Sequence, residues 1–196
     1  MRVFGTILAG GQGMRMGGAD KALLMLGGMP LLARCVARLA PQVVALAVSA
    51  NGDPARLAGF GLPILADPIL ADPILADPVP GFSGPLAGIL AGMIWAEALG
   101  ADALVTVAVD TPFFPTDLVA RLLPSGMAVD AAGLHPTFAL WPIALRPALA
   151  AALAQGERRV ADFATASGIR RVLFSGDRFF NINRPEDLAA AEVRLA

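Results

Sequence analysis

The sequence predicts an α/β fold of three layers, in which helices cover both faces of a mostly parallel sheet. Short apolar runs of strand length alternate with longer segments of helical spacing along the chain. These runs contain almost no polar residues, which is typical of parallel strands buried on both faces. With 196 residues, of which 56% are hydrophobic and 16% are charged, the chain can build a substantial core. We therefore expect a single domain over residues 1–196.

Four strands and two helices are predicted in the first part of the chain. The strands are the apolar runs VFGTIL (3–8), VVALAVSA (43–50), GLPILAD (61–67) and ALVTVAVD (103–110). The helices are PLLARCVARLA (30–40), with Pro30 near its start, and GPLAGILAGMIWAEALG (84–100). Ser83 is a candidate N-cap for the second helix, and Gly100 is its stop signal.

The second part of the chain continues the alternation. Its predicted elements are a helix at PTDLVARLL (115–123), short strands around MAVDAA and HPTFALW, helices near 143–155 and 158–167, and a strand at RRVLF. The segment FFNIN then leads into a last helix, RPEDLAAAEVRLA. Asn183 and Glu186 have the spacing of a capping box, so Asn183 is a candidate N-cap.

The motif ILADP occurs three times in tandem, at 64–68, 69–73 and 74–78. A proline at every fifth residue is incompatible with a helix or a central strand. We interpret one copy as the end of the third strand and the other two as a ten-residue insertion within about 67–78. Surface loops tolerate such insertions at little cost in free energy, so no function is required of this one.

Composition excludes several classes of function. The net charge is −1 and no basic run exceeds two residues, so nucleic acid is not an expected partner. The single cysteine, Cys35, excludes a disulfide framework and a zinc cluster. No segment has the pattern of a signal peptide or of a membrane span, so we expect neither a membrane partner nor export, and predict a cytoplasmic protein.

The chain has one lysine, Lys21, and three asparagines, Asn51, Asn181 and Asn183, although arginine and alanine are abundant. In a chain with this bias, lysine is expected to be replaced by arginine wherever either residue serves. We therefore treat these four positions as enriched for residues that chemistry requires.

A glycine-rich loop follows the first strand, in the segment LAGGQGMRMGGADK (8–21). Its five glycines allow the backbone to approach an anion, while Arg15 and Lys21 bring the positive charges that phosphates require. Lys21 is not followed by Ser or Thr, which excludes a Walker P-loop. Residues 21–52 contain no Asp or Glu, which excludes a Rossmann dinucleotide loop.

Ligands of open α/β sheets lie beyond the carboxyl ends of the strands. This rule points to Leu8 onward, to Ser49 through Asn51, and to Asp110. A lone carboxylate at a strand end suits Mg²⁺, which keeps most of its waters and shares phosphate oxygens. An Asx-turn before Pro112 is the structural alternative for Asp110.

The segment 8–21 resembles the nucleotidyltransferase signature of the MobA-like NTP transferase family. The blocks GPLAG (84–88), DTP (110–112), HPTFAL (135–140), GERRV (156–160) and NINRPEDL (181–188) resemble that family in the same order, so the resemblance covers nearly the whole chain. It implies a Rossmann-like nucleotidyltransferase fold. LAGG resembles the guanylyl type, whereas cytidylyl relatives usually read LAAG, so Gly11 favours GTP over CTP.

The resemblance implies the transfer of GMP from GTP to the terminal phosphate of molybdenum-molybdopterin, which yields molybdopterin guanine dinucleotide and pyrophosphate. It also implies Mg²⁺ as cofactor, with contacts to other proteins of molybdenum cofactor biosynthesis and to molybdoenzyme chaperones. The alternatives are a molybdopterin cytidylyltransferase, another small-molecule nucleotidyltransferase, and a non-catalytic module that binds GTP or the cofactor.

The resemblance assigns candidate roles residue by residue. The catalytic candidates are Arg15, Lys21 and Asp110, and the metal candidate is Asp110. The nucleotide-binding candidates are Leu8, Ala9, Gly10, Gly11, Lys21, Ser49, Asn51, Asp67, Asp77 and Asp110. The pterin-side candidates are His135, Pro136, Thr137, Arg158, Arg159, Asn181 and Asn183.

Several of these assignments leave an alternative open. The ILADP repeat makes Asp67 and Asp77 equivalent choices for one nucleotide contact. His135 is either a ligand contact or a structural histidine. The pair Arg158-Arg159 is either a binding element or a solvated helix start, and Asn183 either a ligand contact or a helix cap.

Overall fold

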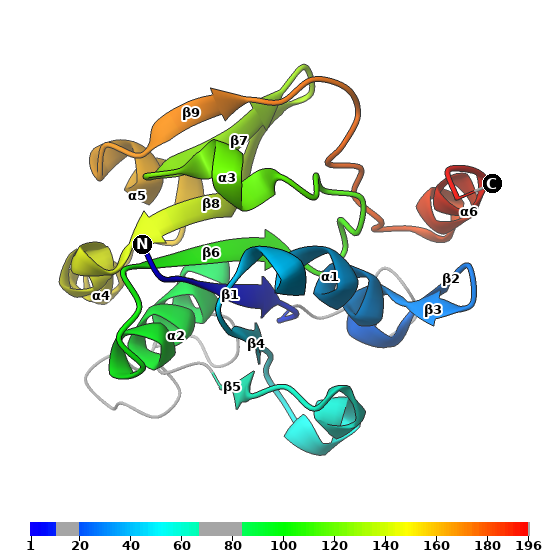
Figure 1. Cartoon of the computed structure of the whole chain (residues 1–196), viewed down its shortest axis with the longest axis horizontal. Coiled ribbons are helices and arrows are strands. Elements are labelled where there is room, and N and C mark those ends of the chain that lie inside the picture. Colours follow the sequence, from blue (N-terminus) through cyan, green and yellow to red (C-terminus); the bar gives the residue numbers. More distant parts are fainter. Residues whose placement is uncertain (11–19, 67–83, 196) are drawn as a thin grey trace.

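The computed structural model describes residues 1–10, 20–66 and 84–195, and in this part of the chain seven strands form one sheet (Figure 1). The strand order is β5-β4-β1-β6-β8-β7-β9. The bounds are β1 Val3–Leu8, β4 Leu46–Ser49, β5 Ile64–Leu65, β6 Ala103–Ala108, β7 Gly126–Asp130, β8 Gly133–Pro142 and β9 Arg170–Leu173. Four neighbouring pairs are parallel, and only β6–β8 and β7–β8 are antiparallel. The predicted mostly parallel sheet is confirmed.

Helices cover both faces of this sheet, as predicted (Figure 1). They are α1 Leu31–Leu39, α2 Gly84–Ala98, α3 Leu118–Leu122, α4 Arg146–Ala154, α5 Val160–Ala166 and α6 Pro185–Val193. Helices α1 and α3 share one hydrophobic cluster with Val3 and Ile7 of β1. Helices α2, α4 and α5 share the other cluster with Phe4 and Leu8. The side chains of β1 thus alternate between two cores, which explains why the whole strand is apolar.

Two glycines allow helix α2 to lie close to the sheet. A Cβ atom added at Gly88 would lie 2.7 Å from Ser49 Oγ, and one added at Gly92 would lie 2.6 Å from Thr6 Oγ1. Both separations are well below van der Waals contact, so neither position accommodates a larger side chain without movement. The start of α2 is thereby held beside the carboxyl ends of β1 and β4.

A tight hairpin explains why β8 runs against its neighbours. Strand β7 ends at Asp130 and β8 begins at Gly133, so two residues make the turn. Asp130 Oδ1 accepts a 2.8 Å hydrogen bond from the N–H of Ala132, a common role of aspartate in turns. The apolar patterns of the sequence predict both strands but not their direction.

Several predicted boundaries require correction. The second and third strands, expected at 43–50 and 61–67, are only Leu46–Ser49 and Ile64–Leu65. The helix expected at 115–123 is Leu118–Leu122. Its C-cap, Leu123, is not helical, which is consistent with the restriction that Pro124 places on the preceding residue.

A small hairpin of β2 (Met25–Leu26) and β3 (Met29–Pro30) is absent from the sequence analysis. Its turn consists of Gly27 and Gly28, which both have positive φ, at 53° and 73°. Two-residue hairpins favour such turns, so the Gly-Gly pair was the signal.

The predicted insertion within about 67–78 and the candidate N-cap Ser83 lie outside the described residues. None of the described helices combines the length and apolar character needed to cross a lipid bilayer.

Candidate functional site

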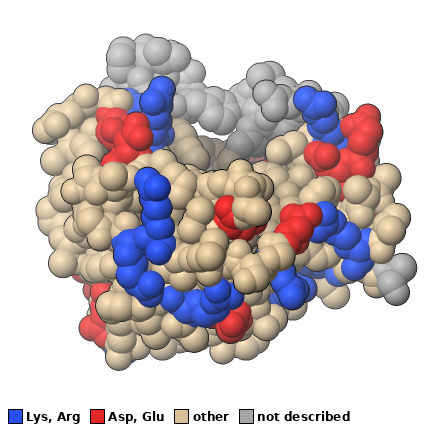
Figure 2. Space-filling model, turned by 90° about the horizontal axis from the view of Figure 1, so that it is seen from above, with Lys and Arg blue, Asp and Glu red and all other residues tan. Residues whose placement is uncertain are grey.

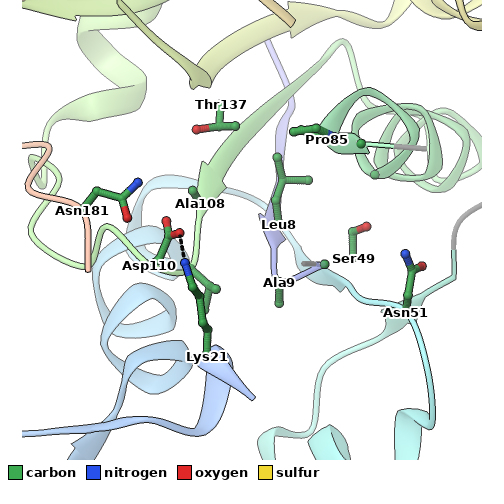
Figure 3. A pocket seen from close by; sticks show the side chains of 14 residues that line it. Leu8, Ala9, Lys21, Ser49, Asn51, Pro85, Ala108, Asp110, Thr137 and Asn181 are labelled. Carbon is green, nitrogen blue, oxygen red and sulfur yellow. Dashed lines mark hydrogen bonds and ion pairs between the residues drawn. The ribbon is translucent and has the colours of Figure 1, made fainter. Parts of the chain in front are cut away.

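A cavity of about 360 Å³ lies at the carboxyl ends of β1, β4 and β6, where the strand-end rule places ligands (Figure 3). Residues from strand ends, from α2, from β8 and from the segment before α6 surround it. Its lining consists of Leu8, Ala9, Gly10, Lys21, Ser49, Asn51, Gly84, Pro85, Gly88, Ala108, Val109, Asp110, Thr137 and Asn181.

One side of the cavity is charged. Asp110 follows β6, and its Oδ2 lies 2.9 Å from Nζ of Lys21, an ion pair drawn as a dashed line in Figure 3. Lys21 also donates to Oδ1 of Asn183. The side chains of Lys21 and Asp110 are only 20% and 19% exposed, so this pair is shielded from much of the solvent screening that weakens surface ion pairs.

Lys21 begins a short 3₁₀ helix, η2 (Lys21–Leu23), that follows the glycine-rich segment. Asp20 caps this turn, because its Oδ1 accepts a 3.0 Å hydrogen bond from the N–H of Ala22. The cap fixes the backbone from which the lysine side chain extends toward Asp110.

The segment before α6 reaches the site through a backbone hydrogen bond. The N–H of Ile182 donates to the backbone carbonyl of Asp110 over 2.7 Å, which brings the segment of Asn181 and Asn183 to the end of β6. Asn181 lines the cavity, and its amide group points toward Asp110 in Figure 3.

The candidate N-cap Asn183 and its capping box with Glu186 are corrected by the structure. Helix α6 begins at Pro185, with Arg184 at the cap position, so the third helical residue is Asp187 and not Glu186. The Asp187 carboxylate accepts 2.9 Å hydrogen bonds from the backbone N–H groups of Asn183 and Arg184. The side chain of Asn183 is thereby left to contact Lys21.

The described residues that line the opposite side of the cavity carry no charge, and we call this the neutral side. Ser49 ends β4 and Asn51 follows two residues later, while the N–H of Ala9 donates to the Ser49 carbonyl over 2.8 Å. Figure 3 shows Ser49 and Asn51 together, across the cavity from Lys21 and Asp110. Helix α2 contributes Gly84, Pro85 and Gly88 to the lining.

His135 makes contacts outside the cavity lining. Its Nε2 lies 2.8 Å from Oδ1 of Asp130, and its ring stacks on Phe179 at 4.4 Å between centroids. Burial disfavours the charge on Asp130, but contacts with His135 and with the N–H groups of Ala132 and Gly133 hold its pKa below the usual 3.8. Of the HPT block, Thr137 lines the cavity, whereas His135 and Pro136 do not.

The two arginines of the GERRV block lie at the start of α5. The backbone N–H groups of Arg158 and Arg159 both donate to Oε1 of Glu157, which holds the pKa of that carboxyl below its usual value. The Arg159 side chain is 82% exposed and lies 3.6 Å from Asp162. Neither arginine lines the cavity.

Four candidates from the sequence, Gly11, Arg15, Asp67 and Asp77, lie outside the described residues. Five further residues line the cavity without a role predicted from the sequence: Gly84, Pro85, Gly88, Ala108 and Val109. The GPLAG block was a signal for the first three. Ala108 and Val109 are ordinary apolar residues at the end of β6, and their position alone brings them to the cavity.

The described residues contain no group of three or more His, Cys, Asp or Glu side chains that could hold a metal ion. Asp110 offers a single carboxylate, whose Oδ1 lies 3.3 Å from the Thr111 hydroxyl. This donor set fits Mg²⁺, which binds through one or two carboxylates when phosphate oxygens and water complete its shell.

Solved structures with the same architecture define the fold as that of nucleotidyltransferases. Molybdopterin-guanine dinucleotide biosynthesis protein A from Archaeoglobus fulgidus is similar with a TM-score of 0.70 and 22% identity, over 98% of both chains. The 2-C-methyl-D-erythritol 4-phosphate cytidylyltransferase from Thermus thermophilus is similar with a TM-score of 0.65 and 22% identity, over 100% of this chain and 98% of that one.

The model of the MobA-like NTP transferase domain matches residues 5–170, and the chain belongs to this family. It is therefore an enzyme of the nucleotidyltransferase class. The molybdenum cofactor guanylyltransferase of Cereibacter sphaeroides is 54% identical over 201 residues, which cover 100% of this chain and 98% of that protein. The proteins of the same name from Rhodobacter capsulatus and Mesorhizobium japonicum are 51% and 49% identical, over 100% and 96% of this chain and 97% and 94% of those proteins.

Proposed function

We propose that this nucleotidyltransferase transfers GMP from GTP to the terminal phosphate of molybdenum-molybdopterin and releases pyrophosphate. The observation that carries the proposal is the cluster of Lys21, Asp110 and Asn183 at one side of a cavity whose other side, among the described residues, is lined by uncharged groups. Such a cavity suits a ligand with a charged end and an uncharged end, as a nucleoside triphosphate has. The full-length similarity to guanylyltransferases supports the choice of GTP.

The proposed reaction needs no nucleophilic side chain. A terminal phosphate oxygen of the pterin attacks the α-phosphorus of GTP, and the bond from that phosphorus to the bridging oxygen breaks as pyrophosphate leaves. Cys35 is fully buried, and burial together with the nearby charge of Asp110 raises the pKa of its thiol, so it stays protonated. Catalysis then depends on positioning and on neutralising charge.

Lys21 is the described cation best placed for this neutralisation. Its ammonium group lies at the cavity beside Asp110, and its three N–H donors suit phosphate oxygens. Arg15 stays a second candidate from the sequence, outside the described residues.

Asp110 would hold Mg²⁺, with Asn181 and Asn183 beside it. When bound, the ion neutralises triphosphate charge and favours the departure of pyrophosphate. This chain contributes the orientation of the Asp110 carboxylate. The hydrogen bond from the N–H of Ile182 to the backbone carbonyl of Asp110 helps to fix that orientation.

Ser49, Asn51 and the backbone of Leu8, Ala9 and Gly10 are proposed to contact the nucleoside end of GTP. All five line the cavity, and Figure 3 shows Ser49 and Asn51 on the side away from Lys21 and Asp110. Gly11 and the choice between Asp67 and Asp77 stay predictions.

The pterin is proposed to enter on the side of Thr137 and Asn181, which line the cavity near Asp110. Asn183 acts there through its contact with Lys21, and His135 supports the adjacent segment through its stacking on Phe179. Roles for Pro136 and Arg159, the cytoplasmic location, and contacts with other cofactor-biosynthesis proteins and molybdoenzyme chaperones stay predictions.

Pyrophosphate release tests the proposal directly. The purified chain is incubated with Mg²⁺, molybdenum-molybdopterin and either GTP or CTP, and the dinucleotide product is separated by chromatography. We expect pyrophosphate and a guanine dinucleotide when GTP is supplied, and neither product when CTP is supplied. Preference for CTP would indicate a cytidylyltransferase, and GTP binding without pyrophosphate release would indicate a non-catalytic module.

A further inference from the structure

One arginine outside the cavity lining connects the two sides of the cavity. Arg56 belongs to the 3₁₀ helix η4 (Pro54–Phe60). Its Nη1 donates to Oδ2 of Asp20 over 2.7 Å, and its Nη2 donates to the carbonyl of Asn51 over 2.8 Å. Asp20 immediately precedes Lys21, so a single guanidinium links the carboxylate beside Lys21 on the charged side to the backbone carbonyl of Asn51 on the neutral side.

The contacts of Asp20 divide between its two carboxylate oxygens. Oδ1 caps η2 through the N–H of Ala22, and Oδ2 accepts from Arg56. The carboxylate therefore fixes the turn that carries Lys21 and at the same time ties that turn to η4.

Arg56 extends from a helix that is itself anchored. Asp53 caps η4 by accepting a 2.8 Å hydrogen bond from the N–H of Ala55, and Leu57 is fully buried. The side chains of Arg56 and Asp20 are 28% and 24% exposed, so water competes only in part for their contacts. An arginine can serve two acceptors at once through its planar fork, whereas a lysine presents a single ammonium centre.

We infer that Asp20 and Arg56 are positioning residues that set the distance between the charged and neutral sides of the nucleotide site. The inference rests on the proposed function, because a nucleoside triphosphate has to contact both sides at once. A site whose two sides move independently loses binding free energy to the ordering of those sides when the ligand binds. Neither Asp20 nor Arg56 lines the cavity, so each acts through Lys21 or Asn51.

Conservative variants separate positioning from charge. Asp20→Asn keeps an oxygen that can cap η2 but removes the ion pair, and Arg56→Lys keeps the positive charge but loses the double contact. The dissociation constant of GTP with Mg²⁺ is measured by calorimetry for both variants and for their combination. The free energy of unfolding in urea is measured in parallel. Arg146→Lys is the matched control, because Arg146 pairs with Glu97 at 2.6 Å near the far end of α2 and has similar exposure.

We expect each single variant to raise the dissociation constant of GTP about five- to tenfold, an effect of about 1–1.4 kcal/mol. The double variant should bind no more weakly than the weaker single variant, because both lose the same connection. Arg146→Lys should bind GTP as the wild type does.

For Asp20→Asn, the direction of the change in GTP affinity separates positioning from charge. If only charge matters, removing a negative charge near a triphosphate strengthens GTP binding. If the contact between Asp20 and Arg56 positions the site, its loss weakens GTP binding. Tighter binding by Asp20→Asn would overturn the inference, as would lowered unfolding free energy with unchanged GTP binding in both variants. Wild-type protein that binds neither GTP nor CTP would instead contradict the proposed function and the inference with it.

Discussion

The two sides of the cavity are built by different physical means. On the neutral side, strand ends and α2 meet through close packing, since a Cβ at Gly88 would lie 2.7 Å from Ser49 Oγ. On the other side, charged and amide side chains from distant segments meet, as in the contacts of Lys21 with Asp110 and Asn183. Substitutions on the first side should act through shape, and those on the second through charge.

The charge distribution on the surface also differs from that at the site. Figure 2 shows a band of adjacent basic side chains on the left of the face seen from above, and basic side chains beside acidic ones elsewhere on this face. Because the net charge of the chain is only −1, we expect no strong general attraction for anions beyond the local charges at the cavity.

The largest effect is expected for Asp110→Asn. The substitution removes the only carboxylate among the residues that the structure places around the cavity, and with it the proposed metal contact. We expect GMP transfer at saturating GTP to fall about 10³-fold, as measured by pyrophosphate release. Transfer within tenfold of wild type, with the same Mg²⁺ dependence, would place the metal elsewhere.

Lys21→Met should have two opposite effects. GMP transfer should fall by at least about tenfold, because a cation near the developing charge is lost. The affinity for Mn²⁺ without nucleotide should rise about fivefold, because the ammonium group and the metal ion compete for the carboxylate of Asp110. Electron paramagnetic resonance of free Mn²⁺ measures the second effect. Weaker Mn²⁺ binding by Lys21→Met would mean that Lys21 does not compete with the metal ion for the carboxylate of Asp110.

Gly88→Ala tests the shape-based side. Its Cβ would collide with Ser49 Oγ and lie 3.0 Å from a methyl group of Leu8, so we expect a loss of about 1–3 kcal/mol in the free energy of unfolding and weaker GTP binding. Gly59→Ala is the matched control, because a Cβ there meets nothing within 4 Å. Equal behaviour of the two variants in urea unfolding would show that α2 can move away without penalty.

The smallest effect on the site is expected at Asp130, which lies outside the cavity lining. Because its pKa is below the usual value in the folded protein, the unfolded chain binds its proton more readily. The stability that Asp130 contributes is therefore fully present above about pH 4 and is lost as the pH falls through the folded-state pKa. The free energy of unfolding of wild type and Asp130→Asn should differ by a constant amount above about pH 4 and converge as the pH falls through the folded-state pKa of Asp130, while GTP binding near neutral pH changes little. A gap that does not close in acid would contradict this assignment.

Local patterns along the chain were sufficient for much of the fold. The apolar runs at β1 and β6 and the helical spacing of α1 and α2 each match the structure closely, because these elements bury nearly continuous apolar faces. The sequence also pointed to Lys21 and Asp110, since one follows a glycine-rich segment and the other ends a buried strand.

Contacts between distant segments were decided only by the tertiary structure. Lys21 meets Asn183 across 162 residues, and Asp20 meets Arg56 across 36. The spacing of Asn183 and Glu186 predicted a helix cap at Asn183. In the structure the Asn183 side chain contacts Lys21, and the Asp187 carboxylate accepts from the N–H groups of Asn183 and Arg184 at the start of α6. The direction of β8 depended in the same way on the hairpin at Asp130. A residue's neighbours in sequence determine its helical or extended preference, whereas the partner of a polar side chain depends on which chain segments the packed core brings together.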